Sequence, residues 1–156
     1  MARVKFLLTV AAYPLPSRSY DELVCTAGIT GDGEWIRLYP VPLSFLTDLK
    51  GSGQIKSIKY NWIELDLQKR TDDFRPESHS PVDYKFSDLI ILGHIDTKQN
   101  WYERKQYCLK NVYTNLDQLL NDSKEPKTAL FLSRSIIYVY NKAGLRKTEQ
   151  TPPRRI

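Results

Sequence analysis

The sequence predicts a mainly β fold with two or three short helices. Apolar side chains alternate at a period of two in several short segments, which is typical of half-buried strands. Turn signals rich in Gly and Pro separate these segments, as in a β-barrel or a sandwich. The chain has 156 residues, which suits one domain or two very small ones with a real core. No apolar run reaches the roughly 20 residues that a membrane helix needs.

The first half of the chain reads as four strands around one small helix. The alternation of Val4, Phe6, Leu8 and Val10 predicts a strand, which we prefer to the signal peptide that this basic and apolar start superficially resembles. The turn sequence at residues 30–33 predicts a β-hairpin. The expected elements are strands at 3–12, 22–30, 34–39 and 60–68 and a helix at 43–49.

The second half is more helical and ends in a basic segment. Residues 69–84 are polar and contain Pro76 and Pro81, so we expect a connection there. The later elements are expected to be a strand at 89–95, helices at 98–110 and 115–121, and short β-rich runs at 128–132 and 135–140. The predicted organisation is an OB-like β-barrel half at 1–68, the connection at 69–84, a second, smaller α+β or OB-like half at 85–141, and a flexible basic tail at 142–156. The two halves could pack as two small OB-like units, the second one incomplete.

The charge of the chain favours a polyanion as partner. Lys and Arg total 23 against 18 Asp and Glu, which gives a net charge of +5, and 12% of the residues are aromatic. A basic chain that is rich in aromatic residues favours nucleic acid or another polyanion as a binding partner. Residues 142–156 hold five Lys or Arg side chains against Glu149, so most of the net charge lies in this tail. A specific site must therefore come from local clusters of Arg and aromatic residues.

The cysteines and the missing motifs argue against catalysis. Cys25 and Cys108 are far apart in sequence and fit free, buried thiols in a reducing cytosol. Alternation places Cys25 with Leu23 and Ala27 on the expected core face. The chain has no Cys-x-x-Cys pair, Walker motif or Gly-x-Gly-x-x-Gly motif. We therefore expect no catalytic residue, no metal site and no cofactor.

One strand of the hairpin carries a candidate binding face. Trp35, Arg37 and Tyr39 share one side of it, while Ile36 and Leu38 share the other. An Arg between aromatic rings combines a phosphate-binding group with stacking surfaces, as in sites for single-stranded nucleic acid. Alternatively, Trp35 and Tyr39 are core residues and Arg37 pairs with a carboxylate.

Further candidates lie outside this strand. In that alternative the partner of Arg37 is a carboxylate such as Glu64, on the strand 60–68, where Trp62 is a further stacking candidate. Arg18 lies between two Ser residues in the loop before the hairpin and could grip a phosphate.

The segment from Asp72 to His79 is the second candidate site. Arg75 can bind a phosphate through two hydrogen bonds, and Ser78 can add a hydroxyl donor. Glu77 could orient Arg75 or act as a general base. Alternatively, the segment is a structural latch, in which Arg75 and Glu77 pin the crossing between the two halves.

Several of these residues together resemble a known family. The strand from Leu7 to Val10, the segment Cys25-Thr-Ala-Gly28 and the segment Trp35-Ile-Arg37 are similar to the pattern of the prokaryotic dual-OB-fold domain, over residues 4–40. The run from Asp73 to Ser78 resembles the Arg-x-Glu-type connection of that group. The resemblance implies two tandem OB-like barrels, a role in binding nucleic acid, and settings such as phage or mobile-element conflict systems. The second half is shorter and more helical than a full second barrel.

We predict a cytoplasmic, non-enzymatic module that binds single-stranded DNA or RNA and does not associate with membranes. Its predicted contact residues are Arg18, Arg37, Tyr39, Trp62, Arg75 and Ser78. One alternative is a nucleotide-sensing or nucleotide-processing domain centred on Arg75, Glu77, Ser78 and His79. Another alternative is a small inhibitor that binds a host protein, a role that a Tyr-rich surface would also suit.

Overall fold

The computed structural model describes residues 2–12, 15–16, 22–122, 124, 132–133, 138–141 and 144–147. The chain divides into two compact units. Unit one comprises Met1–Lys110 and Lys127–Leu130, and unit two comprises Asn111–Pro126 and Phe131–Ile156. Among the described residues, no helix is long and apolar enough to cross a lipid bilayer.

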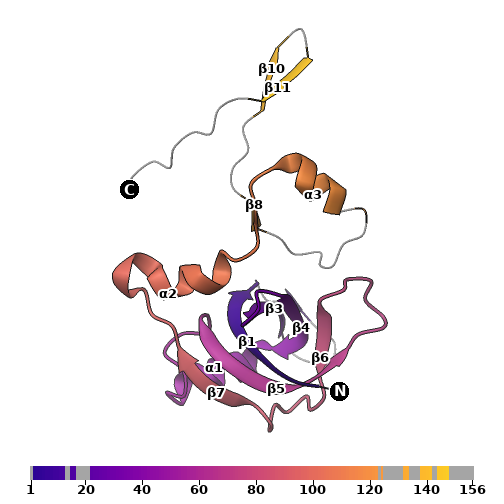
Figure 1. Ribbon diagram of the computed structural model, residues 1–156. Coiled ribbons are helices and arrows are strands. Elements are labelled where there is room, and N and C mark those ends of the chain that lie inside the picture. Colours follow the sequence, from indigo (N-terminus) through magenta and orange to yellow (C-terminus); the bar gives the residue numbers. More distant parts are fainter. Residues whose placement is uncertain are drawn as a thin grey trace. The chain divides into compact units, whose positions relative to one another are not determined.

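Unit one contains a closed five-stranded β-barrel (Figure 1). Around the barrel the strands are β1 (Ala2–Ala11), β3 (Glu22–Thr30), β4 (Trp35–Pro42), β6 (Ser78–Pro81) and β5 (Asn61–Lys69), and β1 also pairs with β5. All neighbours are antiparallel except β4 and β6, which are parallel. Along the chain, helix α1 (Leu43–Gly51) connects β4 to β5. This strand order confirms the expected OB-like barrel.

The barrel closes through a strand that the sequence did not reveal. Strand β6 lies within residues 69–84, which were expected to be a connection. Its buried side chains include Ser78 and Ser80, which are 0% and 5% exposed, so it lacks the apolar alternation of an ordinary strand. Two strands extend the same sheet: β2 (Leu15–Pro16) pairs with β3, and β7 (Ile90–His94) pairs with β5.

The barrel interior follows the predicted alternation of β4. Ile36 and Leu38 point into the core, whereas Trp35, Arg37 and Tyr39 lie on the outer face. The interior side chains are Phe6, Leu8, Val24, Ile36, Leu38, Val41, Leu46, Ile63, Leu65, Leu67 and Phe86.

The pairing of β1 with β3 depends on a glycine. A Cβ atom on Gly28 would collide with both the Leu7 carbonyl oxygen and Phe6 Cδ2. Only a residue without a side chain fits this close approach of two strands.

Helix α2 (Lys98–Cys108) completes the described part of unit one. Its first turn is irregular because Gln99, Asn100 and Trp101 have left-handed φ angles of 51°, 55° and 64°. The helix was expected to bury Trp101, Cys108 and Leu109, but it buries no residue, and Trp101 and Leu109 are 52% and 54% exposed. The expectation was wrong because α2 contacts the barrel through polar and aromatic side chains rather than through an apolar face.

Unit two is built of short elements. Strand β8 (Val112–Tyr113) pairs in parallel with β9 (Leu132–Ser133), and α3 (Leu116–Asp122) follows β8 in the chain. Strands β10 (Tyr138–Asn141) and β11 (Gly144–Lys147) form a hairpin. Strand β11 thus falls within the segment 142–156 that was expected to be a flexible tail, and the rest of that segment lies outside the described residues.

Candidate functional site

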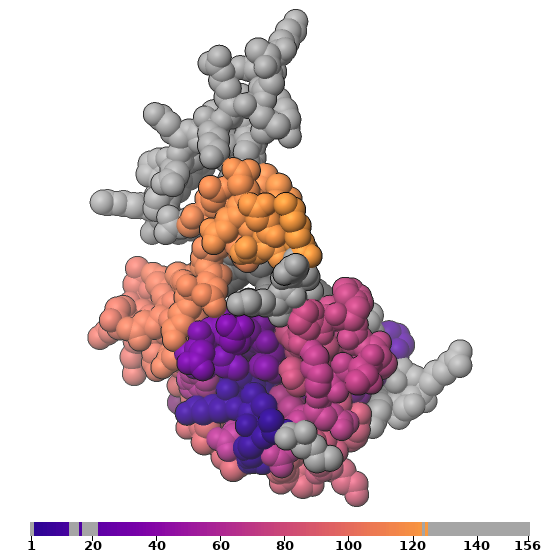
Figure 2. Space-filling view, turned by 45° about the vertical axis from the view of Figure 1, so that its right-hand side comes forward, coloured from indigo at the N-terminus to yellow at the C-terminus, as the bar shows by residue number. Residues whose placement is uncertain are grey.

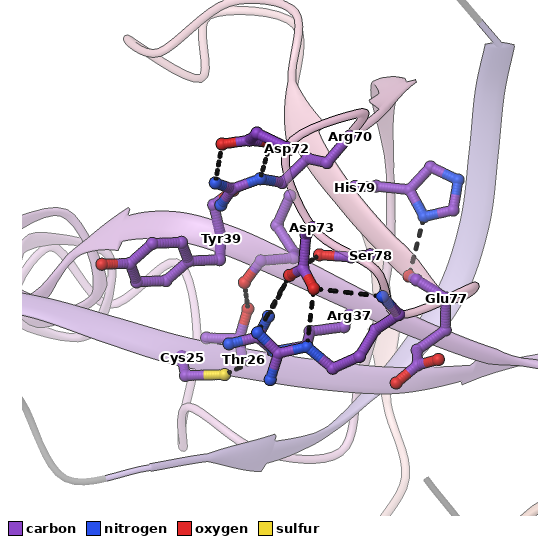
Figure 3. Close-up of polar contacts among 12 residues, drawn as sticks. Cys25, Thr26, Arg37, Tyr39, Arg70, Asp72, Asp73, Glu77, Ser78 and His79 are labelled. Atoms are coloured by element: carbon purple, nitrogen blue, oxygen red, sulfur yellow. Dashed lines mark hydrogen bonds and ion pairs between the residues drawn. The ribbon is translucent and has the colours of Figure 1, made fainter. Parts of the chain in front are cut away.

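The outer face of β4 and the loop at residues 70–77 enclose a surface pocket of about 260 Å³. The loop connects β5 to β6, and β6 pairs with β4, so the strand order of the barrel brings the loop onto β4. The pocket is lined by Arg37, Tyr39, Arg70, Asp72, Asp73, Phe74 and Arg75. Figure 3 shows the polar contacts that arrange these side chains.

Asp73 is the centre of this arrangement (Figure 3). Its side chain is 6% exposed. Arg75 donates from Nε to Oδ1 at 2.8 Å and from Nη2 to Oδ2 at 2.9 Å, and its backbone N–H donates to Oδ1 at 3.1 Å. Arg37 Nη1 and Ser78 Oγ donate to Oδ2 at 2.8 and 2.7 Å. The hydrogen bonds from Arg75 and then from Ser78 hold the pKa of Asp73 well below its usual value, so this carboxylate is ionised.

Arg37 is held in place from three sides. Besides its ion pair with Asp73, it donates from Nε to Cys25 Sγ at 3.1 Å, and its guanidinium lies 5.6 Å from the centre of the Tyr39 ring. The side chain is only 12% exposed. The alternative drawn from the sequence was a carboxylate partner such as Glu64, which instead pairs with Arg3 at 3.0 Å. Glu64 is out of reach because β6 lies between its strand and β4.

Cys25 is placed differently from the prediction. It was expected on the core face with Leu23 and Ala27, but the barrel interior is filled from β3 by Val24 instead. Cys25 is partly buried on the outer face, beside Arg37.

Tyr39 lies between two guanidinium groups. The Arg70 guanidinium is 5.4 Å from its ring centre, and Arg70 Nη1 donates to the Tyr39 carbonyl oxygen at 3.4 Å. Arg70 is oriented by Asp72, to which Nε and Nη2 donate at 2.9 and 2.6 Å. These bonds raise the pKa of Arg70 and lower that of Asp72. The sequence analysis missed Arg70, because only the loop between the last two barrel strands brings it to Tyr39.

Phe74 is the most exposed large apolar side chain among the described residues, at 92%. The Arg75 guanidinium lies 5.6 Å from its ring centre, and the Arg75 side chain is 34% exposed. The loop therefore presents an aromatic ring and a guanidinium group side by side. Asp73 fixes the position of this guanidinium through its hydrogen bonds with Arg75.

The rest of the segment 72–79 has a supporting place. Ser78 and Glu77 are 0% and 3% exposed, and the Ser78 hydroxyl is directed at Asp73. The Glu77 carbonyl oxygen accepts from the backbone N–H of Arg37 at 2.9 Å and lies 2.8 Å from His79 Nδ1. The Arg75 guanidinium forms two hydrogen bonds to Asp73, so Asp73 is a carboxylate that pins this loop.

Of the six predicted contact residues, the pocket brings together Arg37, Tyr39 and Arg75. Ser78 is buried and does not line the pocket, but its hydroxyl donates to Asp73, which does. Trp62 lies elsewhere, next to Lys5 and Tyr107. Arg18 lies outside the described residues. In the part of the chain that the structure describes, no group of three or more His, Cys, Asp or Glu side chains could hold a metal ion.

The sequence profile of one protein family, described as a domain of unknown function (DUF8758), matches residues 2–110. The chain belongs to this family. The matched region comprises the barrel strands, β7 and α2, and thus nearly all of the described part of unit one. Searches of the curated proteins and of the solved structures find no significant match.

Proposed function

We propose that unit one binds single-stranded nucleic acid, DNA or RNA, in the pocket between β4 and the loop at residues 70–77. One observation carries the proposal: the arginines and aromatic rings cluster where OB folds bind oligonucleotides. That site is formed by the second and third barrel strands and by the loops after the first and fourth strands. In this chain β4 is the third barrel strand, and the loop at 70–77 follows the fourth.

The pocket offers both kinds of contact that a single strand needs. Arg75 and Arg70 supply guanidinium groups for phosphates, and the Tyr39 and Phe74 rings supply surfaces on which bases stack. Stacking on an aromatic side chain is worth about 1–3 kcal/mol per base. Phe74 is already exposed, so a base can cover it without any rearrangement of the barrel.

The aspartates of the pocket orient its arginines. Three arginines face two aspartates, which leaves the cluster with a positive charge. Because Asp73 binds both Arg37 and Arg75, these groups are held in one conformation before a ligand arrives. Binding then costs less side-chain entropy than with free arginine side chains.

The two alternative functions would use the same pocket differently. A nucleotide site centred on Arg75, Glu77, Ser78 and His79 has less support, because Glu77 and Ser78 are buried. An inhibitor surface would use Phe74 as the apolar centre of a protein contact. A cytoplasmic location, a link to conflict systems and the relation to dual-OB-fold domains stay predictions from the sequence.

Fluorescence anisotropy of labelled oligonucleotides tests the proposal. The probes are oligothymidylate and oligouridylate of about 15 nucleotides, a duplex of the same length, and a mononucleotide. We expect the single strands to bind more tightly than the duplex, and the affinity to fall as salt rises. Binding of the mononucleotide alone would favour the nucleotide site. No binding of either single strand at about 50 mM salt would overturn the proposal.

A further inference from the structure

A second cluster of cations and aromatic rings lies outside the pocket. Trp62, near the start of β5, contacts the Tyr107 ring edge-on at a centroid distance of 5.0 Å and an interplanar angle of 84°. Lys5 Nζ lies 5.5 Å from the Trp62 ring centre, and Lys110 Nζ lies 5.9 Å from that of Tyr107. The cluster thus joins β1, β5 and α2.

The same arrangement continues along α2. The Arg104 guanidinium stacks 3.6 Å from the centre of the Tyr60 ring and lies 5.6 Å from that of Trp101. Its Nε and Nη2 donate to the Ile95 carbonyl oxygen at 3.1 and 2.8 Å, which fixes its position. Trp101 and its neighbour Tyr102 are 52% and 58% exposed.

The cations of this cluster differ from those of the pocket in how they are neutralised. In the pocket each arginine forms an ion pair with an aspartate. Among the described residues, Lys5, Arg104, Lys105 and Lys110 form no ion pair within 4.0 Å. Helix α2 carries one carboxylate, Glu103. With Lys98, Arg104 and Lys105 against this one carboxylate, α2 itself is positively charged and complementary to a polyanion.

Packing within unit one does not explain the exposed rings. Helix α2 buries none of its residues and protrudes from the side of the barrel (Figure 2). A helix without an apolar face gains little from its hydrophobic contacts with the fold. Trp62 and Tyr107 are partly buried where α2 meets the barrel, whereas Trp101 is exposed beside the Arg104 guanidinium. An exposed ring beside a cation that lacks an acidic partner is typical of surfaces that bind single strands.

We propose that Lys5, Trp62, Trp101, Arg104, Tyr107 and Lys110 form a second nucleic-acid contact, the α2 surface. The inference rests on the proposed function and extends it: one strand occupies the pocket and the α2 surface together. The two sites lie toward opposite ends of β5, and residues 62–69 span about 23 Å at the usual rise of a strand. A strand that reaches both must be longer than one that fills the pocket alone.

Oligonucleotide length and salt dependence test the inference. The double variant Lys5→Ala/Lys110→Ala removes two exposed lysines of the α2 surface, and Lys50→Ala/Lys85→Ala removes two exposed lysines elsewhere as a charge-matched control. The probes are oligothymidylates of about 4 and about 20 nucleotides, at the lower end of the range that one OB fold covers and above that range. The Kd for each is measured by anisotropy at several salt concentrations, after circular dichroism shows that every variant folds.

We expect Lys5→Ala/Lys110→Ala to weaken binding of the long probe and to make its plot of log K against log salt shallower by about 1.4, since each lost phosphate contact removes about 0.7. We expect the control variant to bind the long probe with the same affinity and the same salt slope as the wild type. If the two double variants give the same slope and affinity, the proposal that the α2 surface binds nucleic acid is overturned. The proposal that the pocket binds nucleic acid is not affected by that result. If the wild type binds neither probe, both the proposed function and this inference are overturned.

A cross-linking measurement checks the same surface without substitutions. The long probe carries 5-iodouracil, which reacts with nearby aromatic side chains on irradiation, and the linked peptides are located by mass spectrometry. We expect links within residues 98–110 as well as within residues 70–77. Links confined to residues 70–77 would contradict the α2 surface.

Discussion

Arg37 on β4 and Asp73 in the loop between β5 and β6 form a 2.8 Å ion pair in which both side chains are nearly buried, at 12% and 6% exposure. This pair ties a loop that contains no regular structure to the outer face of the barrel. Because Asp73 also binds Arg75 and Ser78, one carboxylate holds two of the three arginines that line the pocket.

Asp73→Asn should destabilise unit one more than Asp72→Asn does. The Asp73 carboxylate accepts from three side chains and one backbone N–H, whereas Asp72 is 69% exposed and pairs with Arg70. An amide replaces one acceptor oxygen with a donor and leaves Arg37 in a buried place without its counter-charge. Urea denaturation of the two variants and the wild type measures the difference. Equal loss of stability in both variants would show that Asp73 has no special role.

The contribution of Asp73 should disappear in acid. Its pKa is lowered in the folded state from a usual value of 3.8, so the folded protein binds fewer protons than the unfolded chain. The stabilisation is therefore fully present above pH 3.8 and is lost as the pH falls through the folded-state pKa. The gap in unfolding free energy between the wild type and Asp73→Asn should be constant near neutral pH and should narrow below pH 3.8. A gap that does not change with acidification would contradict this.

Phe74→Ala should reduce binding without reducing stability. The ring is 92% exposed, so its removal costs the fold little, and we expect a change in unfolding free energy within about 0.5 kcal/mol. The loss of one stacked base should raise the Kd for single strands by about 5-fold or more. Thermal unfolding and anisotropy on the same preparation separate the two effects. Unchanged affinity would remove Phe74 from the binding surface.

Gly28→Ala should destabilise the barrel, and Gly31→Ala should not. A methyl group on Gly28 would collide with the backbone of Leu7 and the ring of Phe6, whereas at Gly31 nothing lies within 4 Å. Forcing an extra methyl group into a packed core costs about 1–3 kcal/mol. Urea denaturation of both variants gives the comparison. A Gly28→Ala protein as stable as the wild type would contradict the close approach of β1 and β3 at this glycine.

The sequence was sufficient for the parts of the fold that depend on local alternation. The side chains of β4 could be assigned to inner and outer faces because Ile36 and Leu38 alternate with Trp35, Arg37 and Tyr39. Strand β6 could not be found in this way, because its buried side chains are polar and its partners come from distant parts of the chain.

The candidate site was predictable only in part, for the same reason. Arg37 and Arg75 could be chosen from residue type, but their shared partner Asp73 depends on the parallel pairing of β4 with β6. Glu64, the carboxylate given as an example from the sequence, is separated from Arg37 by that same strand. The role of Arg70 likewise follows only once the loop is seen against Tyr39.

The most direct test of the pocket compares Arg75→Gln with the wild type in binding oligothymidylate of about 15 nucleotides. Arg75 is the most exposed of the three arginines in the pocket, and Lys50→Gln on α1 serves as a control that removes one charge elsewhere. At about 50 mM salt we expect the wild type and Lys50→Gln to bind equally, and Arg75→Gln to bind about 5-fold more weakly or worse. Equal binding of Arg75→Gln and the wild type would contradict the central claim that this pocket holds the nucleic-acid strand.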